Sequence, residues 1–233
     1  MTKTKIPWAD YSWGVLTGCS HSGSPGCDHC YASAMARRFH RPWGSATFHP
    51  EKLDEPRHVK KPSRIFVAST SDPWHESVTD SERQKILFVA LNETRHTFIM
   101  LTKRPENIDP ATRFPPNVWV GVSAENQEQY RIRWNELCRR VRAKVRFVSV
   151  EPMLGPVRIF GHPPDWVICG SENGAGKRPC DQQWIADLAS ECHFYGPSFF
   201  DKSSPFIRRE YPQGRSWKTD KRDEPNIRRE YPK

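Results

Sequence analysis

Three cysteines near the start of the chain have a spacing that suits metal binding. Cys19, Cys27 and Cys30 lie in the segment TGCSHSGSPGCDHCYA, with seven residues between the first two and two residues between the last two. Three thiolates close in sequence can bind three irons of a [4Fe–4S] cluster and leave the fourth iron open to a small molecule. The segment is rich in Gly and Ser, which lets its backbone wrap closely around such a cluster.

Zinc is the alternative metal. Cys27 and Cys30 form a good half-site for tetrahedral zinc, and His21 or His29 could complete a mixed Cys/His set. Zinc sites usually combine two separated ligand pairs, and the sequence shows no clear second pair. The other four cysteines have no close cysteine partner along the chain and are interpreted as structural thiols; they are Cys138, Cys169, Cys180 and Cys192.

Short apolar runs predict the strands that position the cysteines. The runs are rich in β-branched and aromatic residues and are apolar at consecutive positions, which is typical of buried parallel strands. They cover residues 13–17, 64–68, 97–101, 118–122, 145–150 and 166–169. The first cysteine directly follows the first run. We therefore expect the cysteine segment at the carboxyl end of the first strand, where α/β folds bind ligands.

Helical patterns alternate with these runs, at residues 32–40, 79–91, 125–141 and 181–190. Thr79 and Glu82 form a capping-box pattern, and Asp181 can cap the last helix. Six strands that alternate with helices predict an α/β fold with a parallel sheet. The 233 residues are few for a closed barrel, which takes about 250. We therefore predict an open, partial (β/α)6 TIM-like barrel, with a doubly wound sheet as the alternative.

Polar residues after the second predicted strand could bind a cofactor or substrate. Ser71 and Asp72 can accept hydrogen bonds from an ammonium group, although Asp72 could instead cap a turn. His75 and Glu76 follow closely and could face a substrate, or they could begin a solvated helix.

Further polar groups follow the later strands. Lys103 and Arg104 end the third strand and could hold a carboxylate or a phosphate. Ser123 and Glu151 follow the fourth and fifth strands, where they could contact a cofactor. The turn GSENGAGK begins at Gly170 and lacks the phosphate-loop pattern, so we interpret it as a close backbone approach to a cofactor.

The charge of the chain favours a polyanionic partner. Lys and Arg exceed Asp and Glu by 36 to 27, and phosphate neutralisation is the general source of affinity for nucleic acid. The basic tail, residues 201–233, contains the segment IRREYP twice. It is either a duplicated segment with little structure or a basic arm whose tyrosines stack on bases. We therefore divide the chain into residues 1–200 and the tail.

Nothing in the sequence predicts a membrane partner. No run approaches the roughly 18 apolar residues that a membrane helix needs. The N-terminal segment MTKTKIPWADYSW lacks the apolar core of a signal peptide. We therefore expect a cytoplasmic protein.

The cysteine segment after a first strand resembles the radical S-adenosylmethionine (SAM) superfamily, whose usual spacing is C-x3-C-x2-C. The phage-associated three-cysteine branch of that superfamily is more similar, over about residues 1–200. The ordered segments that carry this resemblance are TGCSHSGSPGCDHCYA, FVASTSDPWHE, LTKRPENI, VGVSAENQ, VSVEPMLGP and WVICGSENGAGKRP. The gap of seven residues instead of three departs from the usual motif and affects how the loop fits around a cluster.

The resemblance implies a partial barrel of the radical SAM type. It also implies a [4Fe–4S] cluster held by Cys19, Cys27 and Cys30, and SAM whose cleavage yields a 5′-deoxyadenosyl radical. His29 lies where the superfamily has an aromatic residue near adenine. A flavodoxin-like or ferredoxin-like protein would supply the electron.

The reaction expected from this resemblance is the isomerisation or rearrangement of a modified thymine-type base in phage DNA, inside the host cytoplasm. Such hypermodification would protect the genome from host restriction. The basic charge of the chain agrees with a DNA or modified-nucleotide substrate. The alternatives are a radical SAM lyase that repairs DNA and a non-catalytic, zinc-containing protein that binds nucleic acid.

Overall fold

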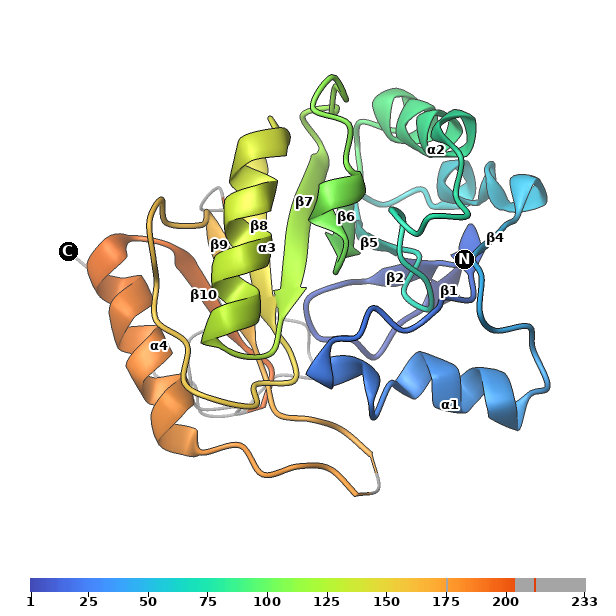
Figure 1. Cartoon of the computed structure of the whole chain (residues 1–233). Helices are drawn as coiled ribbons and strands as arrows, with labels where there is room; N and C mark the ends of the chain where they lie inside the picture. Colours follow the sequence, from blue (N-terminus) through green and yellow to red (C-terminus); the bar gives the residue numbers. More distant parts are fainter. Residues whose placement is uncertain (175, 204–211, 213–233) are drawn as a thin grey trace.

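Seven parallel strands form the centre of the protein. The computed structural model describes residues 1–174, 176–203 and 212. Within them, one sheet has the strand order β1-β2-β5-β6-β7-β8-β9-β10, in which β1 alone runs antiparallel (Figure 1). Its strands are β1 (Thr2–Lys3), β2 (Tyr11–Trp13), β5 (Arg64–Val67), β6 (Thr97–Thr102), β7 (Val118–Ala124), β8 (Val145–Val150), β9 (Trp166–Cys169) and β10 (Ser198–Asp201).

The strand order follows the chain. Each parallel strand pairs with the parallel strand that precedes it, from β2 to β10. A doubly wound sheet reverses its strand order at a switch point, and the described strands do not reverse. The prediction of an α/β fold with a parallel sheet is therefore confirmed.

The described strands differ from the predicted set of six in the first run and in three short strands that were not predicted, namely β1, β4 (Thr47–Phe48) and β10. The first predicted strand is divided, because the chain leaves the sheet after Trp13, and β3 (Leu16–Thr17) pairs with β4 in a separate two-stranded sheet. The strand β10 was not predicted at all. Its four residues contain only two apolar side chains, and its pairing with β9 is what makes them a strand.

The four α-helices lie within a few residues of their predicted positions. Thr79 accepts a hydrogen bond from the amide of Glu82 at 3.3 Å, and Glu82 accepts one from the amide of Thr79 at 2.7 Å, which completes the capping box. Asp181 caps the last helix. The helices are α1 (Tyr31–Arg38), α2 (Asp80–Asn92), α3 (Gln127–Arg140) and α4 (Gln182–Tyr195), with short 3-10 helices η1 (Pro25–Cys27), η2 (Pro50–Lys52), η3 (Glu55–His58) and η4 (Pro105–Asn107).

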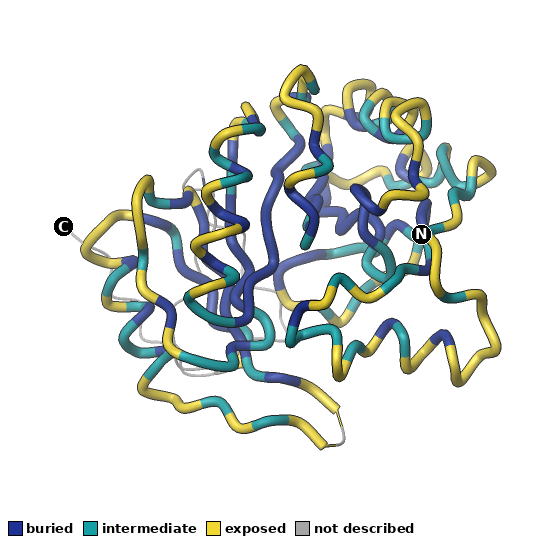
Figure 2. The backbone as a smooth tube through the Cα atoms, viewed as in Figure 1, coloured by how far each residue is buried: buried dark blue, intermediate teal, exposed yellow. Residues whose placement is uncertain are grey.

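One face of the sheet packs against helices. Helix α3 contacts β7 and β8, and α4 contacts β10, on the side that lies in front in Figure 1. Val120 and Val148 belong to the same buried cluster as Trp134 of α3 and Leu188 of α4. Figure 2 shows the strands behind these helices as buried along most of their length. None of the described helices has the length and apolar character that crossing a membrane requires.

The opposite face of the sheet is packed with aromatic rings. The ring of Trp166 on β9 lies 5.6 Å from Trp119 on β7, 5.5 Å from Phe147 on β8 and 6.2 Å from Phe200 on β10, measured between centroids. These side chains are 5% exposed or less. The second face is therefore filled by aromatic side chains from the sheet together with residues of the segment between β1 and β2, such as Trp8.

The position of Trp8 shows that the sheet is curved. Its ring centroid lies 4.7 Å from Phe66 on β5 and 6.3 Å from Trp166 on β9, so these two rings are at most about 11 Å apart. In a flat sheet, the four strand spacings between β5 and β9 would separate them by about 19 Å. The sheet therefore curves around Trp8, with the aromatic face on its concave side.

The predicted boundary at residue 200 falls inside the last strand. The strand β10 ends at Asp201, and the amide of Lys202 donates a hydrogen bond to the carbonyl of Cys169 at 2.9 Å. The two IRREYP segments of the basic tail lie outside the described residues, except for Pro212.

Candidate functional site

The cysteine loop, residues 18–30, lies at the carboxyl ends of the strands, as predicted. Gly26 shows how closely it packs there. A Cβ atom at this position would lie 2.6 Å from Oε1 of Glu125, which follows β7, and 2.8 Å from Nζ of Lys103, which follows β6. Figure 1 shows β6 and β7 pointing toward this end of the molecule, where α1 also lies.

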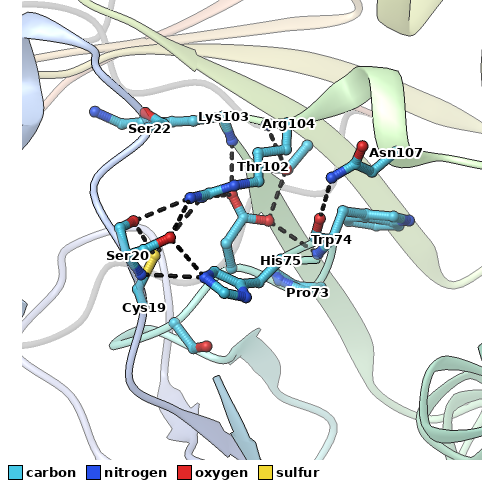
Figure 3. A network of polar contacts seen from close by, with 12 residues as sticks. Cys19, Ser20, Ser22, Pro73, Trp74, His75, Thr102, Lys103, Arg104 and Asn107 are labelled. Atoms are coloured by element: carbon cyan, nitrogen blue, oxygen red, sulfur yellow. Dashed lines mark hydrogen bonds and ion pairs between the residues drawn. The ribbon is translucent and has the colours of Figure 1, made fainter. Parts of the chain in front are cut away.

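Hydrogen bonds from Arg104, which follows β6, hold the first part of the cysteine loop against the sheet (Figure 3). Its Nη2 donates to the carbonyl and to the hydroxyl of Ser20, each at 3.0 Å, and its Nε donates to Glu76 at 3.0 Å. Its Nη1 lies 3.7 Å from Sγ of Cys19 and 3.6 Å from Oδ2 of Asp72. The side chain is 5% exposed. This guanidinium, predicted to bind substrate, is thus surrounded by protein partners.

Asp72 is likewise satisfied by the protein. Its Oδ1 accepts from the hydroxyl of Thr102 at 2.7 Å and from the amide of Trp74 at 2.9 Å, while Oδ2 accepts from the amide of Lys103 at 2.9 Å. The buried carboxylate therefore joins the loop after β5 to the end of β6. Asp72 was predicted to bind the ammonium group of SAM. It would have to do so in addition to these three hydrogen bonds.

Ser71 supports the backbone just before the first cysteine. Its hydroxyl donates to the carbonyl of Gly18 at 2.5 Å. Gly18 has a φ of 80°, and a Cβ atom there would clash with the carbonyl oxygen of Ser45. The amide of Gly44 donates to the carbonyl of Cys19 at 3.0 Å. These contacts fix the direction in which the loop leaves the strand.

His75 is a second buried anchor of the cysteine loop. Its Nε2 accepts from the amide of Ser20 at 3.1 Å, and its Nδ1 lies 2.9 Å from the hydroxyl of Ser77. Burial, together with the charge of Arg104, lowers the pKa of His75, so the ring is neutral at pH 7. The backbone amide of Ser77 also donates to Nδ1, at 3.1 Å, so backbone groups hold both nitrogens of the ring.

The three thiols differ in their surroundings. Burial raises the pKa of Cys19 to about 11, although the nearby Arg104 partly opposes this shift. Sγ of Cys27 lies 3.3 Å from the hydroxyl of Ser22, and Cys30 is the N-cap residue of α1. Among the residues that the structure describes, no three His, Cys, Asp or Glu side chains are grouped to hold one metal ion. The loop brings the thiols to one edge of the sheet without forming such a group.

Glu125, which follows β7, is a buried charge at the same edge of the sheet. It is fully buried and pairs with Lys103 and, at 3.2 Å, with Nη1 of Arg133. Burial alone would raise the pKa of Glu125, but these two cations outweigh burial and lower it. Lys103 also donates to the hydroxyl of Ser24 at 3.4 Å. The cysteine loop therefore packs against three charged side chains that pair with one another, those of Lys103, Glu125 and Arg133.

The Gly26→Ala substitution is expected to destabilise the protein by about 1–3 kcal/mol, because a methyl group would push against the ion pair of the partly exposed Lys103 and the buried Glu125. Urea unfolding measures the change. The matched control is Gly155→Ala, whose nearest neighbour would lie 3.8 Å away, and it should change stability by less than about 0.5 kcal/mol. Equal stability of the two variants would contradict the close packing of the loop.

The family model described as "Protein of unknown function (DUF5131)" matches residues 3–224. The chain belongs to this family. No curated protein and no solved structure matches it. The match extends beyond residue 200 and so includes much of the basic tail of this DUF5131 chain.

A second loop closes on the cysteine loop of the DUF5131 chain. Glu172, after β9, lies 3.1 Å from Nδ1 of His29 and accepts from Nε of Arg178 at 3.0 Å. Nη2 of Arg178 donates to the carbonyl of Pro25 at 3.0 Å. Hydrogen bonds from Arg178 lower the pKa of Glu172 to about 2. The carboxylate is thus charged at neutral pH and links the two loops through His29 and Arg178.

The remaining predicted residues of the DUF5131 chain form a separate group at the same edge. The hydroxyl of Ser123 donates to the carbonyl of Glu151 at 3.3 Å. The carboxylate of Glu151 pairs with Lys202, and a Cβ atom at Gly170 would lie 3.2 Å from it. Sequence reasoning missed Lys202, Glu172 and Arg178. Their charges were visible, but their partners are distant along the chain.

Proposed function

We propose that this DUF5131 protein is a radical SAM enzyme. Its cysteine loop would hold a [4Fe–4S] cluster through Cys19, Cys27 and Cys30. The enzyme would isomerise or rearrange a modified thymine-type base during phage DNA hypermodification, which protects the genome from host restriction. One observation carries the proposal: three thiols lie on one loop that is fastened to the carboxyl ends of a parallel sheet.

The donor set suits iron. All three thiols are partly exposed, so a cluster could reach them without unfolding the sheet. A cluster spreads its thiolates over separate irons, so its ligands need not converge on a single atom. When bound, it would supply the electron that cleaves SAM to a 5′-deoxyadenosyl radical, and the protein would orient the reactants.

Arg104 would assist metal binding by Cys19. Burial raises the pKa of this thiol and so opposes the release of the proton that metal binding requires. Arg104, 3.7 Å away, would then stabilise the thiolate. The same guanidinium holds Ser20 and so positions the residue next to the ligand.

The fold supports the proposal through its strand order and curvature. Parallel strands that follow one another in sequence order, around a concave face filled with side chains, are features of TIM-like barrels. We infer a partial barrel of the radical SAM type, with seven parallel strands instead of the predicted six.

Two of the predicted residues are best placed to contact SAM or substrate. The side chain of Glu76 is 63% exposed and that of His29 is 43% exposed, whereas those of Asp72, His75 and Arg104 are 8% exposed or less. We therefore propose that Glu76 and His29 face the bound molecules. The buried three hold the loop that carries the cysteines.

Anaerobic reconstitution with iron and sulfide tests the chemistry. We expect a brown protein with about four irons per chain. With a flavodoxin-like or ferredoxin-like electron donor, it should convert SAM to 5′-deoxyadenosine. A colourless protein that binds one zinc ion and leaves SAM intact would overturn the proposal.

The DNA substrate requires a separate measurement. Nucleoside mass spectrometry of phage DNA, made with and without this gene, should show a modified thymine-type nucleoside that depends on the gene. An unchanged nucleoside profile, together with active SAM cleavage, would contradict the DNA-modification part of the proposal alone.

A further inference from the structure

A long segment next to the cysteine loop has no acidic residue. Residues 29–50, which contain α1 and the loop to β4, include no Asp or Glu but three arginines. Arg37, Arg38 and Arg41 are all exposed. None of the three forms an ion pair with any residue that the structure describes. Figure 2 shows α1 and the loop after it as exposed over much of their length. Their charge is therefore available to a partner.

An aromatic ring lies among these cations. Phe39 is 52% exposed, and the guanidinium carbons of Arg38 and Arg41 each lie 5.5 Å from its ring centroid. Guanidinium groups near an aromatic ring are held there by the ring quadrupole. An exposed ring between two cations combines a surface on which a base can stack with groups that bind phosphate.

The segment returns to the cysteine loop. Cys30 caps α1, so the helix begins where the third thiol lies. After the helix, Trp43 approaches His21, with 6.3 Å between ring centroids, and the amide of Gly44 donates to the carbonyl of Cys19 at 3.0 Å. Residues 37–43, which we call the basic–aromatic segment, therefore run from the last turn of α1 back to the cysteine loop.

We propose that the basic–aromatic segment binds a single-stranded stretch of nucleic acid. On binding, Arg38 and Arg41 would move from the ring of Phe39 to contact phosphates, and an unpaired base would stack on the ring in their place. The inference deepens the proposed function and rests on it where it links this surface to catalysis. Enzymes that act on a base require it outside the duplex stack, so a surface that holds unpaired nucleotides beside the thiols suits that chemistry.

The test uses the full chain without a cluster and a short, fluorescein-labelled oligodeoxythymidylate. Fluorescence anisotropy measures affinity over a range of salt concentrations. The Arg38→Ala/Arg41→Ala double variant should bind more weakly, and its slope of log affinity against log salt should be shallower by about 1.4, since each phosphate contact on single strands contributes about 0.7. The Phe39→Ala variant should lose about fivefold or more in affinity with an unchanged slope.

The matched control is Arg113→Ala/Arg131→Ala, which removes the same charge from two other exposed arginines. It should retain the wild-type slope. The proposal would be overturned if the salt slope decreased equally in both double variants, or if Phe39→Ala bound the oligonucleotide as tightly as the wild type. Either result would show that net charge alone binds the strand. A polyglutamate peptide that competes as well as unlabelled oligodeoxythymidylate would indicate an acidic protein partner instead. An oligouridylate arm establishes whether DNA or RNA binds more tightly.

The outcome is separable from that of the proposed function. Oligonucleotide binding is measured without a cluster, whereas iron content and SAM cleavage are measured without nucleic acid. Specific binding by a chain that assembles no cluster would refute the proposed enzyme and leave the binding surface intact. If the enzyme is active and neither Phe39→Ala nor Arg38→Ala/Arg41→Ala changes its affinity for the oligonucleotide, only the proposed binding surface is refuted.

Discussion

Replacing Cys27 by alanine is expected to prevent stable cluster binding and to reduce SAM cleavage to background. Only Cys19 and Cys30 would remain to hold four irons, so two irons would lack a protein ligand instead of one. The effect should be complete, because the open iron would react with SAM only in an intact cluster. Iron and sulfide content after anaerobic reconstitution, with 5′-deoxyadenosine formation, measures it.

The matched control for Cys27→Ala is Cys180→Ala. Both residues are partly exposed free thiols, but Cys180 lies after β9, where it packs against the hydrophobic core and its sulfur lies 3.8 Å from the backbone carbonyl of Asp181. The control should assemble the cluster and cleave SAM like the wild type. Equal losses in the two variants would indicate that the thiols act through stability and not as ligands.

A structural effect of Cys27→Ala can be measured separately. The thiol has one described side-chain partner, the hydroxyl of Ser22 at 3.3 Å, and is not fully buried. The urea midpoint of the cluster-free variant should therefore correspond to a change of less than about 0.5 kcal/mol. A normally folded Cys27→Ala protein with a full complement of iron would refute the ligand assignment.

Local patterns predicted most of the elements. Runs such as residues 118–122 and 145–150 are apolar on both faces, and the structure buries both faces, one under helices and one against other rings. The cap residues Thr79 and Asp181 also act as expected, because a cap depends on residues two or three positions away. The cysteine loop directly follows β3 of the two-stranded sheet, so its predicted position at the strand ends of the parallel sheet depends on its packing against Lys103 and Glu125.

The polar contacts at the strand ends could not be predicted in the same way. The sequence shows that Asp72 and Arg104 follow strands, but not that they lie 3.6 Å apart and both support the cysteine loop. Arg178 and Glu172 are only six residues apart, yet the same guanidinium also bonds to Pro25, on a different loop. Such pairings depend on which strands are neighbours, and the sequence does not specify strand order.

Replacing Arg104 by methionine is expected to destabilise the protein by about 3–5 kcal/mol, because it removes one member of a buried ion pair. Asp72 would lose its cation, and the carbonyl and hydroxyl of Ser20 would lose their donors. Urea unfolding of the cluster-free protein measures the change. The matched control is Arg139→Met, whose 78% exposed side chain pairs with Glu136 and should contribute less than about 1 kcal/mol.

The Arg104→Lys variant separates the charge of Arg104 from its shape. Lysine keeps a positive charge near Cys19 and Asp72, but it lacks the planar fork that reaches Ser20 and Glu76 together. If the fork positions the loop, Arg104→Lys should fold better than Arg104→Met and still load less iron than the wild type. A purely structural role of Arg104 would alter the unfolding midpoint and leave cluster loading unchanged. Wild-type iron content in both folded variants would therefore show that Arg104 stabilises the fold without positioning the ligands.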